Sequence, residues 1–418
     1  MKSSMPGRPA PVGAALVLLL ALLTALDAMA IDMYLPGMPA IAADFGASPG
    51  RIQQTLSVFL AGLAIGQGLY GPLLDRYGRR MPLLIGVAVF VAGSVMAALA
   101  PSVEWLLAAR FLQALGAAAG LVTPRAIVAD LCTLAESARI FSLLMQVMML
   151  GPILAPILGG YLLGHGGWRS IFWMLAALGA AGCVWGWRAI PDSLPRARRV
   201  PMAPRAMLGA YAGQLRRSVF MAYALAGGCI LGSLFVYISG AAFVFTGHFA
   251  LTPETFSYVF AGNSVALVLG GVLSNALLKR RQSAQRVMVA GMALHALAGG
   301  ALFLAAGSAA ITLPVYAGLL AVAVGALGLV FGNLTALTMH HAGKQAGVAS
   351  ALMGMVHYLL AAVIGYAVSL WGQDIAALPL AVAACGAAAL LLAWRAQALA
   401  SAGARAASNT AQMDFKRR

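Results

Sequence analysis

Twelve apolar runs of membrane-spanning length, separated by short polar breaks, constrain the fold of this chain more than any other feature. An α-helix needs about 20 apolar residues to cross the hydrocarbon core of a bilayer. Because a spanning segment must satisfy its backbone hydrogen bonds internally, we predict an all-α integral membrane protein with twelve transmembrane helices. The runs lie near residues 12–34, 52–72, 82–100, 105–123, 140–163, 168–190, 219–243, 255–278, 287–307, 311–334, 347–371 and 376–395.

The composition excludes an ordinary soluble domain. The 418 residues are 62% hydrophobic and only 9% charged, whereas soluble domains carry about 25% charged residues. The first run resembles a secretory signal peptide, since Lys2 and Arg8 precede it and Ala28-Met29-Ala30 looks like a cleavage site. We expect it to remain as the first helix, because it is long enough to span and eleven similar runs follow.

Lysines and arginines are distributed unevenly between the two sides that twelve spans define. With an even number of spans, both termini and the even-numbered loops share one side, and 24 of the 27 basic residues fall there. Arg51 and Arg169 fall on the other side, and Arg110 lies within the fourth run. By the positive-inside rule we predict both termini in the cytoplasm and a multi-pass location in the cytoplasmic (inner) membrane. The net charge of +16 is then a topology signal and does not indicate nucleic-acid binding.

The one long polar stretch divides the chain into two halves of six spans. It covers residues 191–217 and is rich in proline and arginine. We predict a simple cytoplasmic linker there; a phospholipid-binding stripe is the alternative. The predicted domains are a cytoplasmic N-terminus at 1–11, a six-helix bundle at 12–190, the linker at 191–217, a second six-helix bundle at 218–395 and a basic cytoplasmic tail at 396–418.

Two carboxylates, Asp27 and Asp32, lie inside the first span. An ionisable group within a span costs about 2.5–3.5 kcal/mol at the helix centre on insertion scales, and such groups usually face a wet cavity. We therefore predict a proton or ion relay. The alternative is that Asp32 lies at the membrane interface and only Asp27 is submerged.

The two halves carry a short repeat at equivalent places. GPLLDRYGRR at 71–80 follows the second span, and GVLSNALLKR at 271–280 follows the eighth. A duplicated six-span unit is typical of secondary transporters, whose substrate site lies at the repeat interface. GPLLDRYGRR also resembles the loop 2–3 signature of the major facilitator superfamily. The resemblance implies conformational gating by Gly71, Asp75, Arg76, Gly78, Arg79 and Arg80.

Two further motifs resemble those of proton-coupled members of the same superfamily. RFLQALGAAAG at 110–120 resembles the fourth-helix motif and supplies Arg110 and Gln113, although Ala114 stands where glycine is usual. Arg110 and Gln113 share a helix face. Snorkelling to the periplasmic surface is the alternative for Arg110. GPILAPILGG at 151–160 resembles the antiporter motif, which implies exchange; its motif residues are Gly151, Pro152, Pro156, Gly159 and Gly160.

Several stretches narrow the resemblance to twelve-span drug–proton antiporters of the bicyclomycin/chloramphenicol resistance (Bcr/CflA) subfamily. They are IDMYLPGMPAIAADF at 31–45, RAIVADL at 125–131, HGGWRSIFWM at 165–174 and AGVASALMGM at 346–355. The resemblance implies a multidrug-type exporter. It also ranks Asp32 first and Asp27 second as proton carrier, with Arg110 polarising the cavity. The two acids point about 140° apart on an ideal helix, so they are not expected to face one point.

Aromatic and polar side chains in the spans are candidates for the substrate cavity. The alternative for each is packing, since span aromatics often pack or form interfacial belts and span polar groups often hydrogen-bond between helices. The candidates are Tyr34, Phe59, Gln113, Phe141, Gln146, Phe235, Tyr237 and His357.

The motifs that are absent from the sequence limit the chemistry. The sequence has no phosphate-binding loop, no H-E-x-x-H and no paired cysteines, so we expect no ATP drive, no metal, no cofactor and no enzyme activity. We predict a monomeric, proton-coupled exporter of small, mostly apolar drugs, with protons, a small-molecule substrate and membrane lipid as its partners. The alternatives are an exporter of an endogenous metabolite such as an amino acid or sugar, and a membrane sensor that does not transport.

Overall fold

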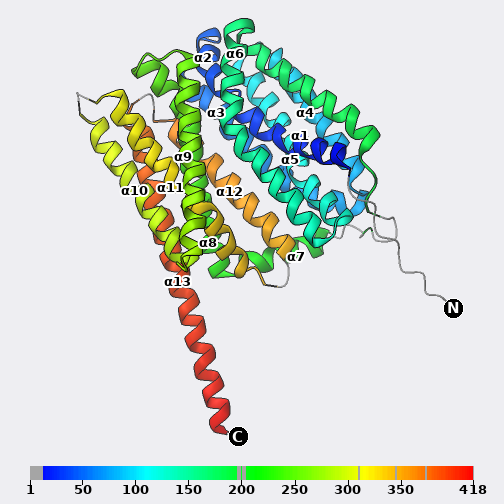
Figure 1. The fold of residues 1–418 in the computed structure, drawn as a ribbon, viewed down its shortest axis with the longest axis vertical. Helices are drawn as coiled ribbons and strands as arrows, with labels where there is room; N and C mark the ends of the chain where they lie inside the picture. The colour runs from blue at the N-terminus through cyan, green and yellow to red at the C-terminus, as the bar shows by residue number, and fades with distance from the viewer. Residues whose placement is uncertain are drawn as a thin grey trace, which may run out of the picture. The chain divides into compact units, whose positions relative to one another are not determined.

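A computed structural model describes residues 13–194, 199, 204–308, 311–343, 346–371 and 374–417, and every regular element in these ranges is helical (Figure 1). The predicted cytoplasmic N-terminus at 1–11 and part of the predicted linker lie outside the described residues. The chain divides into two compact units. Unit 1 comprises Met1–Ala47 and Val58–Met202, and unit 2 comprises Ser48–Ser57 and Ala203–Arg418.

Unit 1 contains the first six predicted spans. Its elements are α1 (Ala14–Asp32), the 3-10 turn η1 (Leu35–Gly37), α2 (Met38–Asp44), most of α3 (Pro49–Tyr77), α4 (Arg80–Ala98), α5 (Val103–Leu131) and α6 (Leu134–Ala189). Helix α5 packs against α1 and α4, and α6 packs against the same two helices. Helix α3 begins in unit 2 and continues in unit 1.

Helix α6 joins two spans that the sequence separates at 163–168. Gly167 has φ +68° and ψ 177°, which is not helical, so α6 is two helices that meet at this residue. Eleven helices in the described ranges are long and apolar enough to cross a membrane, and α6 is counted once among them. The break at Gly167 therefore accounts for the twelve predicted spans.

Unit 2 repeats the helix pairings of unit 1. Its elements are α7 (Pro204–Leu215), α8 (Ser218–Phe243), the π-helical turn η3 (Val244–His248), α9 (Pro253–Lys279), α10 (Ala284–Ala306), α11 (Leu313–His340), α12 (Ala346–Ser369) and α13 (Ala377–Arg417). Helix α10 contacts α11 and α13, as α4 contacts α5 and α6 in unit 1. Helix α8 contacts α11, as α1 contacts α5. Two elements differ from the sequence expectation, since α7 lies within the predicted linker and α13 extends through the predicted tail.

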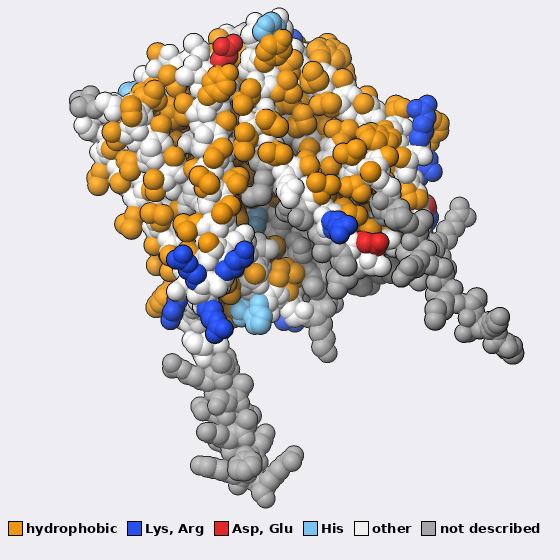
Figure 2. All heavy atoms as spheres, in the orientation of Figure 1, with side chains coloured by type: hydrophobic (Ala, Val, Ile, Leu, Met, Phe, Trp, Pro, Cys, Tyr) orange, Lys and Arg blue, Asp and Glu red, His pale blue; other side chains and the backbone are white. Residues whose placement is uncertain are grey.

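Side chains at the helix starts explain where several spans begin. Ser102 accepts a hydrogen bond from the backbone of Trp105 at the start of α5, and Thr252 and Ser283 cap α9 and α10 in the same way. Such caps satisfy backbone N–H groups that have no partner inside the helix. The long apolar helices between them leave many large hydrophobic side chains exposed, and Figure 2 shows these covering most of the visible face. An outer surface of this kind suits a lipid environment.

Candidate functional site

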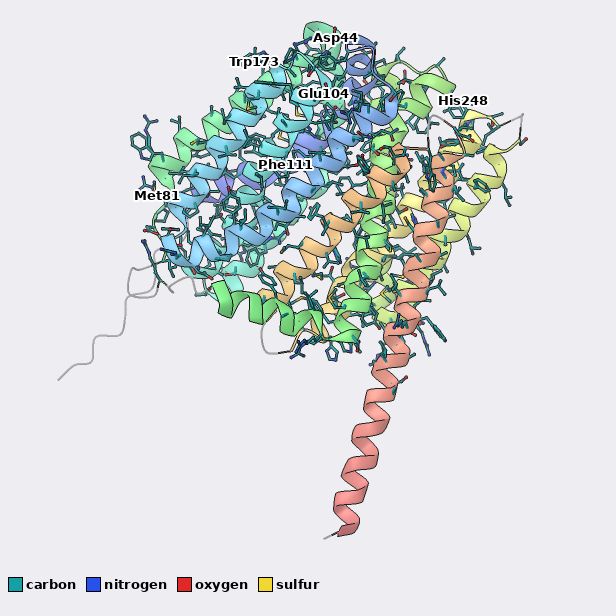
Figure 3. The ribbon with its side chains drawn as sticks, turned by 180° about the vertical axis from the view of Figure 1, so that it is seen from behind. Asp44, Met81, Glu104, Phe111, Trp173 and His248 are labelled. Carbon is teal, nitrogen blue, oxygen red and sulfur yellow. The ribbon has the colours of Figure 1, made fainter. Side chains whose placement is uncertain are left out.

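Arg110 on α5 is the centre of a buried cluster in unit 1. Its side chain is 0% exposed, so it does not snorkel to a surface. Its Nη1 donates to the backbone carbonyl of Ala30 on α1 at 3.0 Å and to Oε1 of Gln113 at 2.6 Å. Figure 3 shows the neighbouring Phe111 between two ends of unit 1, with Asp44 and Glu104 at one end and Met81 at the other. The hydrogen bond to Ala30 places the buried cation between α5 and α1.

Three aromatic rings surround the guanidinium. Its Cζ lies 4.2 Å from the ring centroid of Phe59, 4.7 Å from that of Tyr34 and 5.8 Å from that of Phe172. A cation over an aromatic face gains about 2 kcal/mol when both are desolvated. Among the described residues, Arg110 Nε and Nη2 have no hydrogen-bond partner. Among the described ion pairs none involves Arg110, which is held by rings and by dipoles.

The α4–α5 contact fixes Gln113 in its place. Gln113 Nε2 donates to Ser94 Oγ at 2.8 Å, and Ser94 Oγ donates to the carbonyl of Phe90 at 2.8 Å. The helices approach so closely that a Cβ added at Gly93 would lie 2.5 Å from the backbone nitrogen of Gln113. A chain of hydrogen bonds thus runs from α4 through Gln113 to Arg110 and to the Ala30 carbonyl on α1.

Both acids on α1 are buried. Asp27 is 4% exposed and Asp32 is 3% exposed, and they bracket Ala30, whose carbonyl accepts from Arg110. Among the described residues, Oδ1 of Asp27 has no hydrogen-bond partner. The structure thus buries both acids of the predicted relay on either side of the carbonyl that Arg110 contacts.

The predicted antiporter motif on α6 packs against the acid-bearing segment of α1. A Cβ on Gly159 would lie 2.1 Å from the carbonyl oxygen of Met33, and one on Gly151 would lie 3.3 Å from Cβ of Ala28. Pro156, Gly159 and Gly160 are buried, whereas Gly151 and Pro152 are half-buried. Ala28 follows Asp27 directly and Met33 follows Asp32 directly. Helix α6 therefore contacts α1 immediately beside each acid.

A second charged cluster lies at the end of unit 1 where α3 meets α4. Arg79 donates from Nη1 to Asp75 and from Nε to Asp130 on α5, both at 2.8 Å. Burial lowers the pKa of Arg79, but the two carboxylates outweigh burial and hold it above its usual value. Ser193 Oγ also donates to Asp130, at 2.9 Å.

The remaining gating residues differ in what they contact. Arg80 donates to the carbonyl of Trp187, and the guanidinium of Arg76 lies 5.1 Å from the ring centroid of Tyr77. Gly78 has φ +87°, which explains a glycine in this turn. A Cβ on Gly71 would meet open space, so the structure gives Gly71 no close helix contact.

The predicted cavity residues fall into two groups. Tyr34, Phe59 and Gln113 gather around Arg110 in unit 1, and α6 carries a half-buried Phe141 and an exposed Gln146. The other three residues, Phe235, Tyr237 and His357, are in unit 2.

The unit 2 residues contact other aromatic and polar groups of that unit. The Tyr237 hydroxyl accepts from Asn263 Nδ2 at 3.0 Å, and its ring stacks on Phe260 with 5.3 Å between centroids. Phe235 lies 6.4 Å from the ring of Tyr358. His357 is packed so closely on α8 that a Cβ on Gly227 would lie 2.2 Å from its Nε2.

Four participants in these clusters escaped sequence reasoning. Ser94 has no charge and no motif of its own, Phe172 stands in HGGWRSIFWM without an assigned role, and the Ala30 carbonyl is backbone. Asp130 stands in RAIVADL, which carried a family resemblance but no role. Asp130 is a carboxylate near the end of a span and beside an arginine-rich loop. This position is the sequence signal for a partner of Arg79.

Comparison with known proteins identifies the family. The model of the Major Facilitator Superfamily matches residues 20–366. The chain is similar to the uncharacterized MFS-type transporter YdgK of Bacillus subtilis, with 34% identity over 84% of this chain and 87% of that protein. It is also similar to the bicyclomycin resistance protein homolog of Haemophilus influenzae, with 28% identity over 86% of this chain and 90% of that protein.

The fold also matches solved transporters. The E. coli xylose transporter XylE, in a partially occluded inward-open conformation, aligns with a TM-score of 0.71 over 91% of this chain and 97% of that one, at 14% identity. The prediction of a major facilitator fold of the drug-resistance type is therefore confirmed. This chain belongs to the Major Facilitator Superfamily and is a multi-pass membrane transporter.

Proposed function

We propose that the protein exports small, mostly apolar drugs across the cytoplasmic membrane in exchange for protons. The observation that carries the proposal is the buried cluster of unit 1, in which α1 presents two buried acids and α5 binds the carbonyl between them through Arg110. The named resistance relative supports drugs as the substrate class. The antiporter motif supports exchange, because its helix packs beside both acids.

The mechanism follows from the position of the Arg110 contact. Arg110 binds the Ala30 carbonyl between Asp27 and Asp32 and so fixes the backbone that carries both carboxylates. A proton that reaches one carboxylate from the periplasm removes its charge and changes how well the cavity holds a drug. Binding of the proton then disfavours binding of the drug, and binding of the drug disfavours binding of the proton. This is the coupling that an exchanger needs. Asp32 is the first candidate for the proton carrier and Asp27 the second.

Substitution of each acid in proteoliposomes tests the proposal. With chloramphenicol as an uncharged probe, we expect Asp32→Asn, which mimics the protonated carboxylate, to bind the drug with an affinity that no longer depends on pH. The same variant loses drug export driven by a pH gradient and proton release on drug addition. Asp27→Asn serves as the matched comparison, because it makes the same chemical change in the same helix. Normal export and proton release in both variants would place the coupling site elsewhere.

A further inference from the structure

A cavity of about 310 Å³ lies entirely within unit 2, away from the Arg110 cluster. Its walls come from the start of α3, the end of α8 with η3, the end of α12 and the start of α13. Figure 3 labels His248 at this end of the unit. The volume falls at the lower end of the range for small-molecule sites, about 300–1,000 Å³.

The packing of the helix ends builds the cavity walls. A Cβ on Gly50 would lie 2.2 Å from the carbonyl oxygen of Ser369, so the start of α3 is fixed directly against the end of α12. Gly240 on α8 lies against Leu378 on α13, where a Cβ would be 3.1 Å from Cδ1 of that leucine. These contacts hold the walls together without filling the space between them.

The lining mixes apolar and polar surface, and among the described lining residues the one carboxylate is that of Asp374. Val236, Phe243, Val244, Ile375 and Leu378 contribute the hydrophobic surface. The polar side chains are those of Gln53, His248 and Asp374.

Each polar group has a definite position or partner. Asp374 Oδ1 accepts from the backbone of Ala376 at 2.9 Å, which orients the carboxylate. The His248 ring stands edge-on to Phe249 with 4.8 Å between centroids. Arg51 lies near Gln53 in sequence but donates to Gln54 and does not line the cavity.

We infer that this cavity is a second binding site, which takes a small amphipathic organic cation. Its apolar part would contact the aliphatic and Phe243 walls, and its positive charge would lie near the Asp374 carboxylate. A lining that carries an acid and no lysine or arginine selects a cation over an anion. Under the predicted topology this end of unit 2 is periplasmic, so the site lies on the exit side. The inference rests on the proposed function only in calling this end the exit side.

Gly247 offers a way to fill the cavity without disturbing its walls. It lines the cavity, and a Cβ there would meet nothing within 4 Å. Gly247→Leu therefore adds a side chain to the empty space. Gly318→Leu is the matched control, because Gly318 on α11 also has nothing within 4 Å of a Cβ but lies outside the cavity.

Equilibrium dialysis of the purified full chain with ethidium tests the site without any ion gradient. We expect Gly247→Leu to bind one ethidium fewer per chain than Gly318→Leu. Equal numbers bound by the two variants would overturn the inference. The dialysis measures binding and no transport, so its result does not depend on whether the Asp27 and Asp32 variants lose coupled export. The proposed function and the second binding site can therefore fail separately.

Asp374→Asn tests the charge selectivity in a variant that keeps the shape of the site. We expect the affinity for ethidium at this site to fall about two- to five-fold, the effect of one partly exposed ion pair. The neutral dye N-phenyl-1-naphthylamine should bind Asp374→Asn as it binds the unaltered chain. An equal change for both dyes, or no change for either, would show that the carboxylate does not select a cation.

Discussion

Arg110 shows how a buried cation is accommodated without a carboxylate. The aromatic rings of Phe59, Tyr34 and Phe172 face the guanidinium, and the Ala30 carbonyl and Gln113 accept from one nitrogen. An ion pair with Asp27 or Asp32 would fix a proton-binding group in its charged form. No described ion pair joins Arg110 to either acid, and under the proposed function both carboxylates can then take up and release protons.

Removal of the Arg110 side chain should abolish coupled export. Arg110→Ala loses two hydrogen bonds and three ring contacts, and leaves Gln113 Oε1 buried without its donor, at about 1–3 kcal/mol for such a group. Arg110→Lys should keep part of the export, because one ammonium still reaches an acceptor but lacks the planar fork. Drug-dependent proton flux in proteoliposomes measures both, with melting temperature as the folding control. Unchanged flux in Arg110→Ala would contradict this role.

Helix α6 illustrates which parts of the fold the sequence could predict. The span lengths and the antiporter motif predicted two helices and a role in exchange. The motif did not say what Gly159 touches, because the partner is the backbone carbonyl of Met33, which has no side-chain signature. The break between the two helices was placed near 163–168 and falls at Gly167, where φ is +68°. Apolar periodicity predicts elements, whereas close backbone contacts depend on three-dimensional packing.

The limits of prediction were different at the cluster in unit 1. Asp27, Asp32, Arg110 and Gln113 were found from the cost of polar groups in a membrane and from a motif. The uncharged Ser94 and the backbone carbonyl of Ala30 were not, because neither is unusual in an apolar helix. Helix α7 and the extension of α13 were missed for another reason: the linker and the tail were assigned from their prolines and basic residues, although both segments also contain several alanines, which favour helix.

Enlargement of Gly159 should disturb α1 at the acids. The added methyl of Gly159→Ala would lie 2.1 Å from the Met33 carbonyl oxygen, so α1 and α6 must move apart. We expect a loss of stability of about 1–3 kcal/mol, typical of overpacking, and weaker coupled export. Gly300→Ala on α10 is the control, since a Cβ there meets nothing within 4 Å. Thermal unfolding in lipid nanodiscs compares the two, and equal melting temperatures would contradict the close contact.

Across the whole molecule, the same helix pairings occur in two units whose charges are arranged differently. In unit 1 one loop arginine, Arg79, is bound to two carboxylates, those of Asp75 and Asp130. In unit 2 the carboxylates Glu254 and Asp374 stand at the ends of helices remote in sequence from the basic turn Lys279–Arg281. The two units therefore share helix pairings while each has its own polar features, the Arg110 cluster in unit 1 and the cavity in unit 2.

The basic loops make the orientation of both units testable. The two termini and the segments that join spans on the same side together hold 24 of the 27 basic residues, so both termini and α7 should be cytoplasmic. A fluorescent reporter that folds only in the cytoplasm should be active when fused after Gly209 or after Ala402. Alkaline phosphatase, which needs the periplasm, should be active after Gly46 or Ser308 and inactive at the first two sites. Phosphatase activity after Gly209 would overturn the twelve-span topology, and with it the exit-side position of the unit 2 cavity.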